Sequence, residues 1–124
     1  MTMTKENKEL LLKDLCGRLP YGVKVLIKGK TMTDSTRKQL APNNIFGIQK
    51  DVLYVKPYLR PMSSMTEEER EEYRTECKKV LLMRYRVNSH YPVTDWLNAH
   101  HFDYRGLIEK GLALEAPEGI YKTE

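Results

Sequence analysis

The N-terminal segment distributes its apolar and polar residues with the period of an α-helix. Between residues 5 and 19 the apolar side chains recur at spacings of three and four: Leu11, Leu12, Leu15, Cys16 and Leu19. This spacing places them on one helical face. Pro20 ends the helix because its ring excludes a continued helical backbone. The pattern predicts an amphipathic helix over residues 5–19 that packs against a core.

From Tyr21 the pattern becomes that of β-strands. Residues 23–28 mix β-branched side chains with lysines, and Gly29 closes the run, which predicts a strand. Residues 30–44 are polar and predict a loop with a short strand over residues 38–41.

Two further strands are expected over residues 45–49 and 52–56, joined as a hairpin by Lys50 and Asp51. Pro57 and Pro61 are then expected to end the sheet, because proline cannot donate to a ladder. Together these strands predict a small antiparallel sheet or a partly closed SH3-like barrel.

A second helix is predicted over residues 67–84. Thr66 and Glu69 have the spacing of a capping box, and glutamates fill the first turn, where the helix dipole favours them. We expect these glutamates to form a solvated face. The buried stripe is expected to consist of Tyr73, Cys77, Val80 and Leu81.

Residues 92–113 combine many apolar residues with hydrogen-bonding side chains and predict two short helices joined by a tight corner. Thr94 is a candidate N-cap for the first helix and Asp103 for the second, and Gly111 would end the second in a left-handed conformation. The tail that follows is rich in turn-forming residues, and its Ile120 and Tyr121 would either dock or fray.

The expected fold is therefore a single α+β domain over residues 1–124. It has a leading helix, a β-rich half over residues 20–60, and a helical half over residues 66–114. No run of about 18 apolar residues occurs, so we expect no membrane span. The N-terminus has no apolar signal segment, and we expect a cytoplasmic protein.

Charge is distributed unevenly along the chain. Residues 1–60 hold 12 Lys and Arg against 5 Asp and Glu, whereas residues 61–124 hold 9 against 12. The basic half suggests an anionic partner, although lysines on the wet face of a sheet would give the same count. Basic side chains interleaved with aromatic ones can neutralise phosphates and stack on bases. The candidate ligand-binding residues are Lys24, Lys28, Lys30, Arg37, Lys38 and Tyr54.

Candidate enzyme chemistry is confined to His100, His101 and Asp103, with Asp95 nearby. Such residues can bind a metal or share a proton, but their spacing matches no metal motif, and structural roles explain them better. We therefore predict no catalytic residue, no metal ligand and no cofactor.

Two smaller features do not indicate a site. The sequence Gly29-Lys30-Thr31 resembles the end of a P-loop but lacks the earlier glycine that the motif requires. Cys16 and Cys77 are expected to act as small hydrophobic residues on helix faces, with a disulfide between them as the alternative.

The C-terminal corner offers a candidate surface for a protein partner. An exposed apolar patch is expected there, formed by Trp96, Phe102 and Tyr104 with Arg105 beside them. The corner has the length of a helix-turn-helix, but its second helix lacks the positive charge of a DNA-recognition helix.

Three stretches resemble a family of small uncharacterised proteins from gut Bacteroidetes, their phages and their mobile elements. They are KELLLKDLCGRLPYGVKV at residues 8–25, VKPYLRPMSSMTEEE at 55–69, and DWLNAHHFDYRGLIEKGLALEAPEG at 95–119. The resemblance implies no known activity, but a phage or mobile-element setting favours a small binding protein over a metabolic enzyme.

Our leading hypothesis is a non-enzymatic binding module whose basic half engages a phosphate-bearing ligand, either nucleic acid or a sequestered nucleotide. The alternatives are a protein–protein adaptor or inhibitor, including a homodimer, and a small metal-dependent hydrolase centred on His100, His101 and Asp103.

Overall fold

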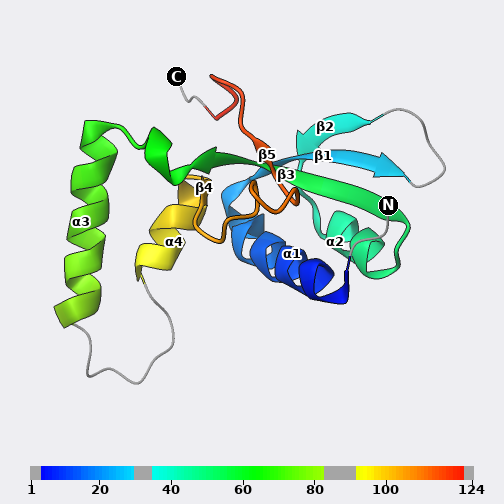
Figure 1. Ribbon diagram of the computed structural model, residues 1–124, viewed down its shortest axis with the longest axis horizontal. Helices are drawn as coiled ribbons and strands as arrows, with labels where there is room; N and C mark the ends of the chain where they lie inside the picture. Colours follow the sequence, from blue (N-terminus) through cyan, green and yellow to red (C-terminus); the bar gives the residue numbers. More distant parts are fainter. Residues whose placement is uncertain (1–3, 30–34, 83–91, 122–124) are drawn as a thin grey trace.

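The computed structural model describes residues 4–29, 35–82 and 92–121, which form a mixed α/β fold (Figure 1). The elements in chain order are α1 (Lys5–Arg18), η1 (Leu19–Tyr21), β1 (Lys24–Gly29), β2 (Thr36–Gln39), α2 (Pro42–Gln49), β3 (Leu53–Pro61), η2 (Met62–Ser64), α3 (Glu67–Leu82), α4 (Pro92–Ala99), β4 (Phe102–Asp103) and β5 (Leu114–Glu115).

Helix α1 confirms the first prediction and lies beneath the sheet beside α2 (Figure 1). Thr4 caps it, because its hydroxyl accepts a hydrogen bond from the Asn7 backbone N–H at 3.1 Å. Leu11 and Leu15 are fully buried against the sheet. The expected burial of Cys16 is wrong, since this side chain is exposed, and the cysteines are free rather than bridged.

The sheet is mixed rather than wholly antiparallel. The strand order is β2-β1-β3-β4, with β5 also paired to β3. Strands β2 and β3 run antiparallel to β1, whereas β4 and β5 run parallel to β3. The order has β2 at one edge, so these strands make an open sheet and not an SH3-like barrel.

The predicted strand over residues 45–49 is wrong, because this segment belongs to helix α2. Pro42 occupies its first turn, and the Asn44 side chain accepts a hydrogen bond from the Ala41 backbone N–H at 2.8 Å. An apolar run this short fits a strand or a buried helix equally well. Lys50 and Asp51 therefore form a helix-to-strand turn in place of a hairpin, with Asp51 at φ 60°.

Strand β3 continues through Pro57, contrary to the prediction that this proline ends the sheet, and it ends at Pro61 as predicted. Pro57 stands opposite Val25, the last pairing with β1. Beyond it β3 changes partners and pairs with β5 through Tyr58 and with β4 through Arg60. Because the β1 ladder ends at Pro57, the missing N–H does not interrupt it.

The capping box of α3 is confirmed. The Thr66 hydroxyl accepts from the Glu69 N–H at 3.1 Å, and the Glu69 carboxylate accepts from the Thr66 N–H at 2.9 Å. Helix α3 is described as far as Leu82, so the predicted end of the helix at residue 84 lies outside the described residues.

The predicted two-helix corner is confirmed for its first helix and wrong for its second. Helix α4 begins at Pro92, so Thr94 lies inside it and is not the N-cap. The expected second helix is replaced by turns between β4 and β5. Positive φ angles at His101 (65°) and Gly106 (73°) turn the chain away from a helical path. Asp103 still caps a turn, since its carboxylate accepts from two backbone N–H groups.

The main core lies between the inner face of the sheet and helices α1 and α2. Its buried members are Leu11, Leu15, Val23, Val25, Leu40, Ile48, Val55, Leu59, Leu107, Leu112 and Ala113. A smaller cluster of Met65, Leu97 and Phe102 lies where α3 meets α4. Among the described helices, none is long and apolar enough to cross a bilayer.

Candidate functional site

The three antiparallel strands β2, β1 and β3 present one face to the core and the other to solvent. Residues directly opposite each other in an antiparallel pair share a face. Buried Val25 and Val55 therefore define the inner face. The side chains that alternate with them make the outer face, which consists of Lys24, Leu26, Lys28, Arg37, Gln39, Tyr54, Lys56 and Tyr58.

The outer face is strongly and uniformly basic. It carries four cations, Lys24, Lys28, Arg37 and Lys56, and none of the strands β1, β2 and β3 contains an aspartate or glutamate. From the rise per residue and the spacing between strands, the positions of these cations extend over about 13 Å along the strands and about 10 Å across them. No carboxylate on the strands offsets their field, so the face attracts anions.

The two tyrosines of the outer face differ in accessibility. Tyr54 stands opposite Lys28 and is 40% exposed. Tyr58 is only 7% exposed, and the Arg37 guanidinium lies over its ring at 4.9 Å from the centroid. The side chain of Tyr54 is therefore much more exposed to solvent than that of Tyr58.

The C-terminal tail docks beside the Lys24 end of β1. The Tyr121 hydroxyl accepts a hydrogen bond from the Lys24 N–H at 2.8 Å and donates to the Tyr58 carbonyl at 2.6 Å. Its ring stacks on His101 with centroids 3.7 Å apart. Burial raises the pKa of Tyr121 to about 12, so the hydroxyl keeps its proton and can donate. Tyr121 therefore docks against the rest of the protein, which was one of the two outcomes expected for the tail.

The predicted ligand-binding residues are brought together in part. Lys24, Lys28, Arg37 and Tyr54 share the outer face, and Lys56 joins them. Lys38 stands opposite Val25 and is therefore on the other side of β2, where it is exposed. Lys30 lies outside the described residues.

The histidine cluster does not converge on one point. His100 faces α3, with Nδ1 at 3.7 Å from Glu69 Oε2. His101 stacks on Tyr121, and burial lowers its pKa to about 4. Asp103 is used as a cap. Within residues 4–29, 35–82 and 92–121, no three His, Cys, Asp or Glu side chains are placed to hold a metal.

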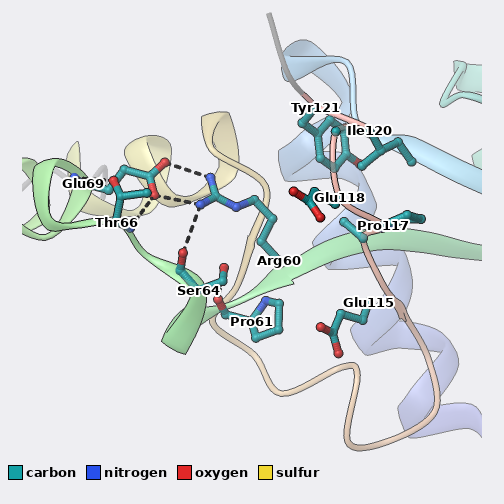
Figure 2. Close-up of a pocket in the computed structure, with 12 residues that line it drawn as sticks. Arg60, Pro61, Ser64, Thr66, Glu69, Glu115, Pro117, Glu118, Ile120 and Tyr121 are labelled. Atoms are coloured by element: carbon teal, nitrogen blue, oxygen red, sulfur yellow. Dashed lines mark hydrogen bonds and ion pairs between the residues drawn. The ribbon is translucent and has the colours of Figure 1, made fainter.

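A cavity of about 620 Å³ lies between the start of α3 and the C-terminal tail (Figure 2). Arg60 lies on one side and forms a bidentate pair with Glu69 at 2.8 and 2.7 Å, while Glu115 and Glu118 lie nearer the tail. The hydrogen bond from Arg60 holds the pKa of Glu69 at about 2. With three carboxylates and one arginine, the lining is poorly suited to phosphate.

The expectation that all glutamates of α3 form a solvated face is wrong for Glu69, whose side chain is largely buried. Its carboxylate joins the capping box of α3 to Arg60 on β3. The capping motif was visible in the sequence, but no spacing rule connects a helix cap to an arginine at the end of a strand.

Of the predicted partner-binding residues, one is buried and three are half-buried. Phe102 is fully buried, and Trp96 packs among Tyr73, His100 and Phe102. The expected exposed apolar patch is therefore wrong for Phe102, whereas Trp96 and Tyr104 remain half-exposed. Tyr104 and Arg105 are engaged by internal hydrogen bonds, to Asn98 at 2.9 Å and to Asp14 at 3.0 Å.

The sequence reasoning missed a buried ionic network beneath this corner. Asp14 and Arg18 are both fully buried on α1 and pair at 2.7 Å, and Arg18 also donates to the Phe102 carbonyl at 2.7 Å. Their spacing of four residues was the available signal. The network fixes the C-terminal corner to α1.

Comparison of the chain with protein-family models, curated proteins and solved structures gives no match. The resemblance to small proteins of gut Bacteroidetes and their phages therefore stays a prediction.

Proposed function

We propose that the outer face of strands β2, β1 and β3 binds nucleic acid through its phosphates. The observation that carries this proposal is the set of four cations on one solvent-facing surface whose strands contain no acidic residue. Lysine and arginine side chains bind nucleic acid by neutralising phosphates and releasing condensed counterions. Lys28, Arg37 and Lys56 are exposed, so a phosphate can reach each of them without displacing another element.

The spread of the cations favours a polymer over a single nucleotide. Positions distributed over about 13 by 10 Å match several phosphates along a chain better than one compact phosphate group. The cavity beside Arg60 offers no alternative nucleotide site, because Glu69 already neutralises Arg60 and two further glutamates line it.

The other two hypotheses receive less support. An adaptor using Trp96 and Phe102 would have to expose the fully buried Phe102, and Trp96 is only half-exposed. A metal-dependent hydrolase would need His100, His101 and Asp103 to converge, whereas each faces a different partner.

The test is the affinity for a fluorescently labelled oligonucleotide of about 12 nucleotides, measured by anisotropy over a range of salt concentrations. If all four cations contact phosphates, the logarithm of the association constant should fall with the logarithm of salt with a slope of about −3. Lys28→Gln and Lys56→Gln should each weaken binding and reduce the magnitude of the slope by about 0.7.

The matched control is Lys13→Gln, which removes an exposed lysine from α1, the helix on the inner side of the sheet. It should leave both affinity and slope unchanged. Equal weakening by Lys13→Gln would mean that net charge alone governs binding. No binding to the wild-type protein at low salt would overturn the proposal.

A further inference from the structure

Strand β2 is the outermost strand at one side of the sheet, so one of its long edges faces away from β1 (Figure 1). In an antiparallel pair, hydrogen-bonded and non-hydrogen-bonded residue pairs alternate. The Leu40 N–H donates to the Val23 carbonyl at 2.9 Å, so this pair is a hydrogen-bonded one. The backbone of Lys38, two residues back, therefore also faces β1, whereas Arg37 and Gln39 direct their N–H and C=O groups away from it.

The contacts on the other side of β1 support this alternation. Lys24 stands opposite Gln39, and its backbone N–H and C=O both contact the Tyr121 hydroxyl, at 2.8 and 3.3 Å. That hydroxyl also donates to the Tyr58 carbonyl of β3, so the Lys24 backbone faces β3 and not β2. Within the described parts of the chain no strand pairs with the far side of β2. The backbone groups of Arg37 and Gln39 thus form an edge to which a further strand can add.

We propose that this edge binds an extended acidic segment of a partner protein by strand addition. Arg37 and Lys38 are both exposed, and they lie on opposite sides of β2 because successive side chains of a strand alternate between its faces. Strands β1, β2 and β3 contain no acidic residue that would compete for these cations. An added strand places one residue beside Arg37 and the next beside Lys38, so two consecutive acidic residues complement both.

The same cations disfavour a second copy of this chain as the occupant. Two β2 strands related by a twofold axis would pair antiparallel through their outward-facing backbone groups. The two registers centred on the strand set either Arg37 or Lys38 directly opposite its own counterpart. Like charges directly opposite each other destabilise a strand pair. The charge of β2 therefore favours an acidic partner over self-pairing.

The backbone contacts are tested on the wild-type protein with a labelled, capped peptide, Thr-Val-Glu-Glu-Val-Thr, whose β-branched residues favour an extended backbone. Its affinity is measured by anisotropy beside two versions that carry N-methyl groups on alternate residues, one on the odd positions and one on the even positions. Only alternate N–H groups of an added strand face β2. One methylated peptide should therefore bind at least about tenfold more weakly than the parent, and the other about as well as the parent. Equal affinity of the two methylated peptides, or no binding of the parent at about 1 mM, overturns the proposal.

Protein variants locate the site. Gln39→Pro removes one outward N–H and leaves every charge in place, so it should weaken the parent peptide about 2-fold to 10-fold. Gln39→Ala is the matched control, since it keeps the N–H and should bind as the wild type does. Lys38→Gln should weaken the peptide about 2-fold to 5-fold, but it should affect oligonucleotide affinity no more than Lys13→Gln does, because Lys38 lies on the other side of β2 from the outer face.

Three results with the variants would overturn the proposal. The first is unchanged peptide affinity in Gln39→Pro, once its unfolding curve shows that it is folded. The second is equal affinity for a peptide with glutamine in place of both glutamates, which would remove the acidic partner. The third is a dimer in solution that Gln39→Pro abolishes, which would assign the edge to a second copy. Each of these results leaves nucleic-acid binding by the outer face to be decided by its own salt series.

Discussion

The ion pair between Arg60 and Glu69 is the best-defined link between α3 and the sheet. The two side chains meet through two hydrogen bonds of 2.8 and 2.7 Å, and Glu69 also caps the helix by accepting from Thr66. Replacing Glu69 by glutamine removes the charge and keeps an oxygen that can accept at the cap. The substitution therefore isolates the electrostatic contribution of the pair.

The expected magnitude follows from the pKa of Glu69. A carboxyl group held at about 2 rather than 4.5 corresponds to about 3 kcal/mol of folding free energy. The Arg60 and Glu69 side chains remain 24% and 17% exposed, so we expect solvent screening to reduce this to about 2 kcal/mol. Because the pKa is lowered on folding, the contribution is present above pH 4.5 and is lost as the pH falls toward 2.

The assay is urea unfolding followed by the fluorescence of Trp96, the only tryptophan, which packs against Tyr73 of α3. Glu69→Gln should lower the free energy of unfolding by about 2 kcal/mol at pH 7, and at pH 3 by less than half of that. Glu71→Gln is the matched control, since Glu71 pairs with Arg74 on the surface of the same helix and should change stability by at most about 0.5 kcal/mol. Equal effects of the two substitutions, or a Glu69→Gln effect that persists undiminished at pH 3, would show that the charge of Glu69 does not stabilise the fold through Arg60.

Three further substitutions test other parts of the fold. Asp14→Ala leaves Arg18 buried without its partner and should cost about 3–5 kcal/mol in urea unfolding, whereas its exposed neighbour Lys13→Ala should change little. Gly47→Ala places a methyl group against the Leu53 side chain and should cost about 1–3 kcal/mol, and an unchanged unfolding midpoint would contradict this packing. Burial holds the pKa of His101 at about 4, so NMR titration should give a midpoint near that value. Because the unfolded chain takes up this proton first, wild-type stability should fall from pH 6.5 to pH 4, and His101→Asn should flatten that part of the profile.

The long amphipathic segments were predictable because several local features agreed. Helix α3 had a capping box, acids in its first turn and a regular apolar stripe, and α1 had its stripe and a terminating proline. The prediction for residues 45–49 was wrong because so short an apolar run fits a strand as well as a buried helix. Pro42 and Asn44 at the start of α2 favour the helix, and Gly47 lets it pack closely against Leu53 of β3.

The prediction of a second helix after α4 was wrong for a different reason. Its residues suit a second helix by composition, but His101 adopts a positive φ while its ring stacks on Tyr121, twenty residues away. That stacking is a tertiary contact, and no local pattern reports it. The same holds for the salt bridge between Arg60 and Glu69.

The candidate site was partly visible as an excess of positive charge in the first half of the chain. The sequence identified the lysines and Tyr54 but could not assign them to faces, because a shift of one residue in strand register exchanges the two faces. The pairing of Val25 with Lys38 and Pro57 settles the register, placing Lys28 beside Tyr54 and Lys38 on the other side.

The most direct test of the central proposal is to map the binding surface by NMR, recording backbone amide shifts while a single-stranded oligonucleotide is added. The shifts should concentrate on β1, β2 and the first half of β3, around Lys28, Arg37, Tyr54 and Lys56, and leave α1 and α3 unchanged. Shifts centred on the cavity beside Arg60, or spread evenly over the molecule, would contradict it.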